Sequence, residues 1–389
     1  MPLNRRTFLK NSGLGLLPVA FPVAGAFASG AETRVETTSP AVKFFGDGEM
    51  FEPADYINEL QKVQALAPIV ADRYGTGGAI ETLEKKFAEI TGKENAIYMP
   101  TGTLANQLAI AVLSGDNTKV FVQDTSHVYR DEADAAQSVF QKRLMPLAKN
   151  ETYFTVDQLK TAIESLAQEE VFKSGIGAVS IENPVRRTFG RMVPIDEIER
   201  ISSYCRSNNI KLHLDGARLY MASAWSGVSI RKYSSYFDTV YISLYKYLGA
   251  AGGAVLCGNK TVIDKMPHLV KTHGGSVYGS WVNGAMALQR LQGFEERMRA
   301  AVKRSAEIFA ALNTLPGIKI SSLDGGTNIY KLEIGTGIDG KVLQERLNKE
   351  FNIRISRPNQ NSPSQLSVNE TLLYKESLYV VNAFKKAMA

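Results

Sequence analysis

An apolar strand that ends in a carboxylate and an arginine lies near the middle of the chain, in Lys211-Leu212-His213-Leu214-Asp215-Gly216-Ala217-Arg218. Open α/β sheets bind their ligands at the carboxyl ends of the strands. An acid in that place can hold a protonated ring nitrogen, and an arginine can pair with a carboxylate through two parallel hydrogen bonds. The structural alternative is that Asp215 caps the next helix and that Arg218 is its ion-pair partner.

Apolar and amphipathic runs alternate on both sides of this strand. The runs expected to form buried strands are Ala96 to Met99, Val120 to Gln123, Ile176 to Ile181, Ile210 to Leu214, Thr239 to Leu244 and Ala254 to Cys257. Helical spacing is found in Ile80 to Ile90, Gly102 to Leu113, Val156 to Ala167 and Ile195 to Ser207. This alternation predicts an α/β fold with a mostly parallel sheet.

The pattern changes near residue 285. One long helix is predicted from about residue 285 to Leu312. The strands predicted after it are Ile318 to Ser321, Ile329 to Ile334 and Ile353 to Ser356. Helices are predicted at Lys341 to Glu350 and at the end of the chain, and a loop is predicted at Pro358 to Pro363. We therefore predict a large domain at 41–290 and a smaller α+β domain at 291–389.

The composition excludes several classes of protein. Of 389 residues, 44% are hydrophobic and 22% are charged, which excludes a disordered or collagen-like chain. Cys205 and Cys257 match no metal or redox spacing, and four histidines leave little material for zinc, so no metal site is predicted. No basic cluster is interleaved with aromatic residues, so a nucleic-acid partner is not expected.

Residues 1–28 have the three parts of an export signal. Asn4-Arg5-Arg6-Thr7-Phe8-Leu9-Lys10 precedes an apolar stretch that ends in Ala26-Phe27-Ala28. The paired arginines resemble the twin-arginine signal, which exports folded proteins across the bacterial inner membrane. A membrane anchor is the alternative, but the apolar run is shorter than the roughly 20 residues that span a bilayer. We expect a periplasmic protein exported by the twin-arginine machinery.

Three further segments that follow predicted strands carry chemically useful groups. Thr101-Gly102-Thr103 opens a helix, and its amides and hydroxyls suit a phosphate. Lys246 ends an apolar run, where desolvation favours the neutral amine that a Schiff base requires. His127 can stack on a flat ring. Taken singly, each has a plainer structural interpretation: Thr103 as an N-cap with Gly102 as a turn residue, Lys246 as a strand-end lysine that reaches into water, and His127 as a solvated loop histidine. With Asp215, they make up the parts of a pyridoxal 5′-phosphate (PLP) site.

Four motifs in this order resemble the threonine aldolase and β-eliminating lyase family, which are PLP enzymes of the aspartate aminotransferase fold. The motifs are Arg73-Tyr74-Gly75 with Leu83-Glu84, Tyr98 to Gln107, Leu212 to Arg218 and Ser243 to Gly249. The resemblance covers roughly residues 43–335. It implies a large domain of the PLP-dependent transferase type (fold type I). It also implies a homodimer or homotetramer with shared sites.

The resemblance also implies a role for individual residues. Lys246 would bond covalently to the cofactor and transfer protons, and His127 would stack on the cofactor ring and take part in catalysis. Asp215 would hold the pyridine nitrogen, and Gly102 and Thr103 would bind the phosphate. Ser243, and Lys271 from a neighbouring subunit, would make further cofactor contacts, while Arg218 would bind the substrate carboxylate.

The departures from the family pattern lie on the substrate side. Phe45-Gly46-Asp47-Gly48-Glu49 stands where the aldolases usually have Ser-Asp-Thr, and Pro184-Val185-Arg186-Arg187 stands where they place a histidine near the substrate hydroxyl. Tyr245 replaces a serine, Tyr278 replaces an arginine, and a second carboxylate-binding arginine has no counterpart in Gln365 to Asn369. Cofactor use is therefore better supported than aldol cleavage.

The favoured activity is retro-aldol cleavage of a β-hydroxy amino acid to glycine and an aldehyde. β-Elimination to pyruvate and ammonia is the first alternative, followed by racemisation or transamination. From other classes, a non-catalytic PLP-binding protein is possible. Ser243-Leu244-Tyr245-Lys246 also fits the Ser-x-x-Lys motif of penicillin-interacting acylases, although that serine should open a helix.

Overall fold

The computed structural model describes residues 40–359 and 364–388. The export signal predicted for residues 1–28 lies outside these ranges, as does most of the loop predicted for Pro358 to Pro363.

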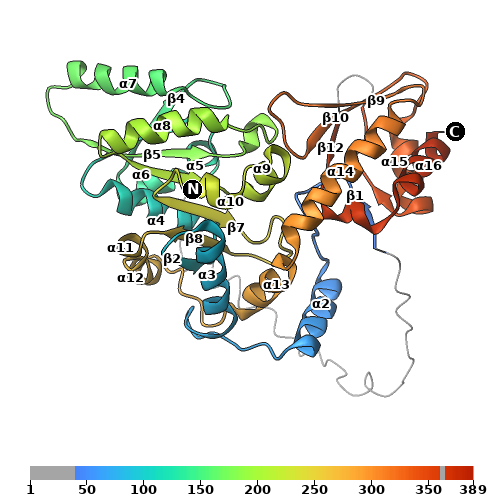
Figure 1. Cartoon of the computed structure of the whole chain (residues 1–389), viewed down its shortest axis with the longest axis horizontal. Helices are drawn as coiled ribbons and strands as arrows, with labels where there is room; N and C mark the ends of the chain where they lie inside the picture. Colours follow the sequence, from blue (N-terminus) through green and yellow to red (C-terminus); the bar gives the residue numbers. More distant parts are fainter. Residues whose placement is uncertain (1–39, 360–363, 389) are drawn as a thin grey trace, which may run out of the picture. The chain divides into compact units, whose positions relative to one another are not determined.

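A seven-stranded sheet organises the larger part of the described chain (Figure 1). In spatial order its strands are β2 (Asn95–Met99), β8 (Ala254–Gly258), β7 (Thr239–Ser243), β6 (Lys211–Asp215), β5 (Ile176–Glu182), β3 (Lys119–Gln123) and β4 (Arg143–Leu147). Within this sheet β8 is antiparallel to both neighbours, and the other pairs are parallel. The predicted α/β class with a mostly parallel sheet is confirmed.

Both faces of the sheet are covered, as the alternation along β8 shows. Val255 and Cys257 belong to one apolar core, whereas Ala254 and Leu256 belong to another. Helices α3 (Gly78–Thr91) and α8 (Ile195–Ser207) pack in the first core, and α4 (Gly102–Ser114) packs in the second. The remaining helices of this region are α2 (Pro53–Leu66), α5 (His127–Arg130), α6 (Ala135–Phe140), α7 (Val156–Glu169), η1 (Arg186–Thr188), α9 (Leu219–Ser226), α10 (Ile230–Ser234), α11 (Lys260–Ile263) and α12 (Met266–Thr272).

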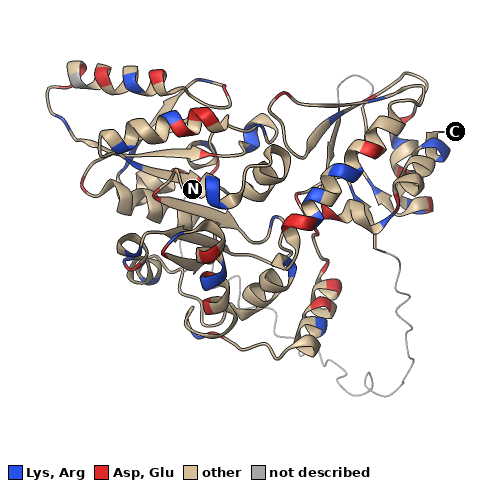
Figure 2. Cartoon of the chain, in the orientation of Figure 1, with Lys and Arg blue, Asp and Glu red and all other residues tan. Residues whose placement is uncertain are grey.

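The helix predicted from about residue 285 to Leu312 is two helices, so that prediction is wrong. They are α13 (Trp281–Leu291) and α14 (Phe294–Leu312). Gly293 separates them with a φ of +63°, a left-handed conformation that glycine adopts without a Cβ clash. Acidic and basic residues are interspersed along α14 (Figure 2), with ion pairs such as Arg299 to Glu295 at 3.7 Å.

The C-terminal part has its own apolar core. It contains an antiparallel sheet in the order β12 (Ser364–Ser367), β10 (Ile329–Ile334) and β9 (Ile318–Ser322), together with α14, α15 (Gly340–Phe351), η2 (Glu370–Tyr374) and α16 (Ser377–Met388). Strand β1 (Val42–Lys43) pairs with β11 (Ile353–Arg354), and Val42 and Phe44 pack into this core. The start of the described chain therefore packs with its end, while the domain limits 41–290 and 291–389 stay a prediction.

The sequence patterns missed strand β4. Of its five residues only Leu144 is buried, and Pro146 cannot donate a backbone hydrogen bond. The strand lies at the edge of the sheet, which is where proline is tolerated. None of the helices in the described ranges combines the length and apolar character needed to cross a membrane.

Candidate active site

A cavity of about 400 Å³ opens where the parallel strands of the large sheet end. Its lining includes six of the predicted site residues, Gly102, Thr103, His127, Asp215, Arg218 and Lys246. They follow β2, β3, β6 and β7, so the sheet topology brings residues distant in sequence to one edge. A larger cavity of about 530 Å³ lies beside Tyr98 and Glu84, and its lining contains none of these six residues.

Two predicted cofactor residues are not in this lining. Ser243 is fully buried at the end of β7. Because it ends a strand and does not open a helix, the Ser-x-x-Lys alternative loses its structural basis. Lys271 is exposed on α12, and its ammonium lies 4.9 Å from the centre of the Tyr74 ring. A contribution of Lys271 to a neighbouring subunit stays a prediction.

Lys246 lies in the loop between β7 and β8 and lines the cavity. Burial, together with the nearby Arg218 guanidinium, lowers its pKa to about 8, against the opposing charges of Asp215 and Asp47. Near physiological pH, a much larger fraction of this side chain is therefore the neutral amine than in a lysine of ordinary pKa, and the neutral amine is the form that attacks a carbonyl.

Asp215 ends β6 and is held at both carboxylate oxygens. Asn106 Nδ2 donates to Oδ2 at 3.0 Å, and the backbone amide of Ala217 donates to Oδ1 at 3.1 Å. The same Asn106 nitrogen donates to Glu132 Oε1 at 2.8 Å. Asn106 on α4 therefore places a donor group between two buried acids, and it orients both carboxyl groups.

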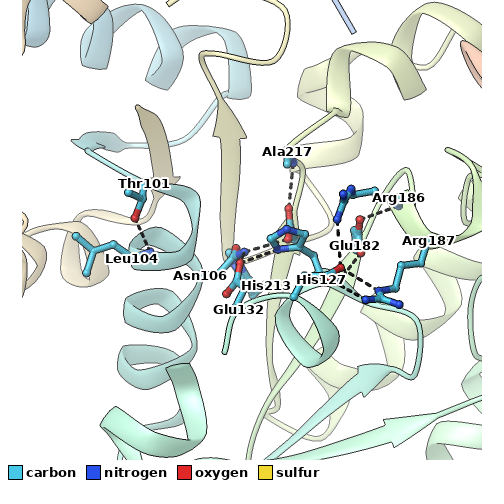
Figure 3. A network of polar contacts seen from close by, with 12 residues as sticks. Thr101, Leu104, Asn106, His127, Glu132, Glu182, Arg186, Arg187, His213 and Ala217 are labelled. Carbon is cyan, nitrogen blue, oxygen red and sulfur yellow. Dashed lines mark hydrogen bonds and ion pairs between the residues drawn. The ribbon is translucent and has the colours of Figure 1, made fainter. Parts of the chain in front are cut away.

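His213 fixes the orientation of that asparagine (Figure 3). Its Nε2 lies 3.0 Å from Asn106 Oδ1, and its Nδ1 lies 2.8 Å from Thr239 Oγ1. Burial lowers the pKa of His213 to about 4, so the ring is neutral at physiological pH. A neutral ring that donates from Nε2 satisfies the amide oxygen and leaves the amide nitrogen for the acids. The chain His213, Asn106, Asp215 thereby orients the carboxylate.

His127 begins the short helix α5 and is held at two points. Its backbone amide donates to Glu182 Oε2 at 2.7 Å, and its Nδ1 lies 3.0 Å from Glu132 Oε1. The hydrogen bond to Glu132 raises the pKa of His127, so the protonated ring is favoured. Burial, with the neighbouring Asp215, raises the pKa of Glu182 to about 7. The backbone amide of Arg186 donates to Glu182 Oε1 at 2.8 Å, so both oxygens of this carboxyl group are held by backbone amides beside the cavity.

The first turn of α4 also lines the cavity. Thr101 is the N-cap, and its Oγ1 accepts from the amide of Leu104 at 3.2 Å. The alternative that Thr103 is the N-cap is therefore wrong. Gly102 is required by space, because a Cβ there would come within 2.1 Å of the Tyr241 hydroxyl. Gly102 and Thr103 bring the helix start close to the cavity, as an anion site needs.

Four polar residues that share this network were not predicted as site residues: Asn106, Glu132, Glu182 and His213. Asn106 and His213 lie within motifs that were quoted for other residues, and Glu182 directly follows the predicted strand Ile176 to Ile181, so each of these three had a usable signal. Glu132 gave none, because its surroundings, Asp131 to Asp134, resemble a solvated polar run, yet it is only 5% exposed.

The geometry defines a class of protein: a fold type I α/β protein with a half-buried lysine and a strand-end aspartate at one cavity. Solved structures of that fold are similar in shape. They include a putative aromatic amino acid β-eliminating lyase/threonine aldolase from Exiguobacterium (TM-score 0.74, 23% identical, covering 90% of this chain and 97% of that one). Another is a putative L-allo-threonine aldolase from Listeria monocytogenes (TM-score 0.72, 24% identical, covering 90% and 97%).

The family follows from the sequence match. The model of the beta-eliminating lyase family matches residues 55–334, and the chain belongs to that family. A low-specificity L-threonine aldolase of Candida albicans is 36% identical over 54% of this chain and 56% of its own length. The alanine racemase TOXG of Cochliobolus carbonum is 33% identical over 54% and 53%. The chain thus spans about half the length of these curated relatives, whereas the match to an Arabidopsis low-specificity L-threonine aldolase, 26% identical, covers 85% and 92%.

Proposed function

We propose that this chain is a PLP-dependent lyase that cleaves a β-hydroxy amino acid between Cα and Cβ, giving glycine and an aldehyde. The observation that carries the proposal is that Lys246, with its lowered pKa, and the fixed carboxylate of Asp215 line one cavity with Arg218. The low-specificity L-threonine aldolases among the similar proteins support the reaction.

The cavity residues fit PLP. Gly102 and Thr103, at the start of α4, would hold the phosphate, Asp215 the pyridine nitrogen, His127 the ring face and Lys246 the aldehyde carbon. The bound cofactor supplies an electron sink for the charge released at the substrate α-carbon. Asn106 and Ala217 hold the Asp215 carboxylate in place, so it would favour a proton on the ring nitrogen.

The protein must also move protons in this reaction. The released Lys246 amine can carry a proton to and from the substrate α-carbon. Val185, in the segment where the aldolases place a histidine, is fully buried and cannot act on a hydroxyl. Glu182 lines the same cavity and has a pKa of about 7, so it is the group we assign to the substrate hydroxyl proton.

The test is product identity. Purified cofactor-loaded protein is incubated with L-threonine, L-allo-threonine, L-serine and L-cysteine. We expect acetaldehyde and glycine from one or both threonine isomers. Pyruvate and ammonia from serine or cysteine, without acetaldehyde from threonine, would replace the proposal with β-elimination, which the absence of the aldolase histidine favours. Bound PLP without turnover of any amino acid would leave the non-catalytic alternative.

The amine of Lys246 is expected to capture PLP with a pH dependence set by its own pKa. Only the neutral amine attacks an aldehyde, so the capture rate of the apoprotein should rise with pH and level off above a midpoint of about 8. Stopped-flow absorbance of the covalent product measures the rate. A midpoint near 10.5, the value of a solvated lysine, would contradict the desolvated position of this side chain.

We also infer that residues 1–28 direct twin-arginine export, so that the protein acts in the periplasm. The support is the sequence Asn4 to Lys10 and the small-residue end at Ala26 to Ala28. In a bacterial host, the native chain should fractionate with the periplasm, and the double variant Arg5→Lys, Arg6→Lys should stay in the cytoplasm. Equal cytoplasmic retention of both would contradict export.

A homo-oligomer is the third part of the proposal, and helix α2 supports it. None of its 14 residues is buried, and Ile57 and Leu66 are 57% and 74% exposed. Apolar side chains exposed on a packed helix are typical of surfaces covered in an assembly. Light scattering should give the mass of a dimer or tetramer, and a monomer at micromolar concentration would overturn this part.

A further inference from the structure

The arginine expected to bind the substrate carboxylate already has a carboxylate partner within the chain. Arg218 Nε donates to Asp47 Oδ2 at 2.7 Å, and the two side chains are 17% and 13% exposed. In the described part of the chain, Nε is the one nitrogen of this guanidinium with a hydrogen-bond partner. None of the residues within 40–359 and 364–388 accepts a hydrogen bond from the two terminal nitrogens, Nη1 and Nη2, and Arg218 lines the cavity.

The segment around Asp47 is held in place from several sides. Asn328, just before β10, donates from Nδ2 to Asp47 Oδ1 at 3.3 Å. Asn369 is fully buried, and its Nδ2 lies 3.1 Å, 3.2 Å and 3.3 Å from the carbonyl oxygens of Lys43, Phe45 and Gly46. The C-terminal part of the chain therefore fixes the position of the Asp47 backbone.

The same segment lies against the residue that follows Lys246. A Cβ at Gly48 would come within 2.5 Å of Tyr247 Cα and 2.9 Å of Tyr247 O, so only glycine allows this approach. The segment around Asp47 thus lies between the loop that carries Lys246 on one side and Asn328 and Asn369 on the other. The Asp47 carboxylate is fixed relative to both the amine and the arginine of the site.

We propose that Asp47 is the positioning residue of Arg218. Asp47 accepts a hydrogen bond from Arg218 Nε and thereby holds the guanidinium at that nitrogen. The terminal nitrogens Nη1 and Nη2 are left for the α-carboxylate of the substrate. A guanidinium has a rigid, planar fork of donors, so fixing one nitrogen fixes the direction of the others. This inference rests on the proposed amino-acid substrate, and it names the group that makes Arg218 selective for a carboxylate.

The positioning matters because the site has little else to bind a carboxylate. Gln365 to Asn369, where the family's second carboxylate-binding arginine was sought, offers no cation, and Asn369 is used to hold the Asp47 segment. Arg218 is also the one arginine in the lining of the cavity. A long arginine side chain without a partner at Nε would have to lose its rotamer freedom on binding, which weakens binding.

The experiment compares two ligands that differ only in the group that Arg218 contacts. Binding of glycine and of glycinamide to the cofactor-loaded protein is measured by calorimetry, in the native protein and in Asp47→Ala and Asp47→Asn. In Asp47→Ala, we expect glycine to bind about 10-fold more weakly or worse, because a charge-assisted contact loses its alignment. Glycinamide should change by less than about 2-fold. Asp47→Asn keeps an oxygen acceptor for Nε and should show a smaller loss.

Steady-state kinetics give a second measure. The KM for the β-hydroxy amino acid should rise in Asp47→Ala, with kcat changing by less than about 3-fold. The matched control is Glu49→Gln, a buried acid of the same segment that pairs with Lys43 and Tyr374 and does not contact Arg218. This variant should leave the ratio of glycine to glycinamide affinity unchanged even if it lowers the melting temperature.

Each outcome decides the proposal. Equal weakening of glycine and glycinamide in Asp47→Ala, no weakening of either, or a shifted ratio in Glu49→Gln would overturn it. Tighter glycine binding in Asp47→Ala would show that Asp47 competes with the substrate, which also overturns it. Because the binding assay does not depend on aldehyde release, selective loss of glycine binding in a protein that cleaves no threonine would leave Asp47 in its role and overturn the proposed reaction alone. A native protein that binds no amino acid overturns both.

Discussion

Replacing Lys246 with alanine is expected to abolish covalent attachment of PLP and to lower turnover by about 10² to 10⁴-fold, the range for loss of a positioned proton-transfer group. Lys246 is the one lysine in the lining of the cavity, and its pKa of about 8 makes its amine available as nucleophile and base. The measurement is mass spectrometry after borohydride reduction with added PLP. The native chain should gain the mass of the cofactor on a peptide that contains Lys246.

A matched control separates this effect from the loss of any buried lysine. Lys142 is 7% exposed, and burial lowers its pKa as it does for Lys246, but it lies outside the cavity. Lys142→Ala should therefore lower stability and still bind PLP covalently. If Lys246→Ala kept a reducible bond to PLP on another lysine at full occupancy, the assignment of the site lysine would be wrong.

The sequence predicted which residues meet at the site better than it predicted the hydrogen-bond partners that hold them in place. Lys246, Asp215 and Thr101 to Thr103 each follow an apolar strand, and parallel strands end at one edge, so strand order alone brings them together. The role of Arg218 in binding a substrate carboxylate was predicted from the stretch Lys211 to Arg218. Its partner Asp47 lies 171 residues away in the chain, and no spacing rule connects two such positions.

Sequence patterns do not predict buried polar networks, because the hydrogen-bond partners in such a network come from segments that are distant in the chain. Glu132 and Glu182 read as ordinary surface or strand-end acids, and their burial follows from donors supplied by distant segments, Asn106 and the backbone of His127. His213 reads as one polar residue in an apolar strand. Its role depends on Thr239 and Asn106, which only the sheet and the helix above it bring near.

The fold was predicted most accurately where apolar spacing and turn residues agree. Strands β2, β3, β5, β6, β7 and β8 all lie within two residues of their predicted limits. The errors have local causes: Pro146 concealed the edge strand β4, and the helical spacing continued across Gly293, where the backbone turns left-handed. A single glycine in an amphipathic run is compatible with either a continuous helix or a break, and tertiary packing selects one.

Asp215→Asn is expected to leave PLP bound and to lower kcat by about 10 to 100-fold, the equivalent of one hydrogen bond to a charged group. Two effects act in the same direction. The neutral amide no longer favours a proton on the ring nitrogen. Its NH₂ group must also face a donor, because Asn106 Nδ2 and the Ala217 amide both point at this side chain.

The measurement pairs visible absorbance, which reports bound PLP, with the rate of aldehyde release at saturating substrate. The matched control is Asp238→Asn: Asp238 also accepts a backbone hydrogen bond, from Leu212 at 2.8 Å, but is absent from the cavity lining. This variant should keep kcat within about 2-fold. An Asp215→Asn protein with native kcat would show that the reaction needs no charged partner at the ring nitrogen, and the role assigned to Asp215 would be wrong.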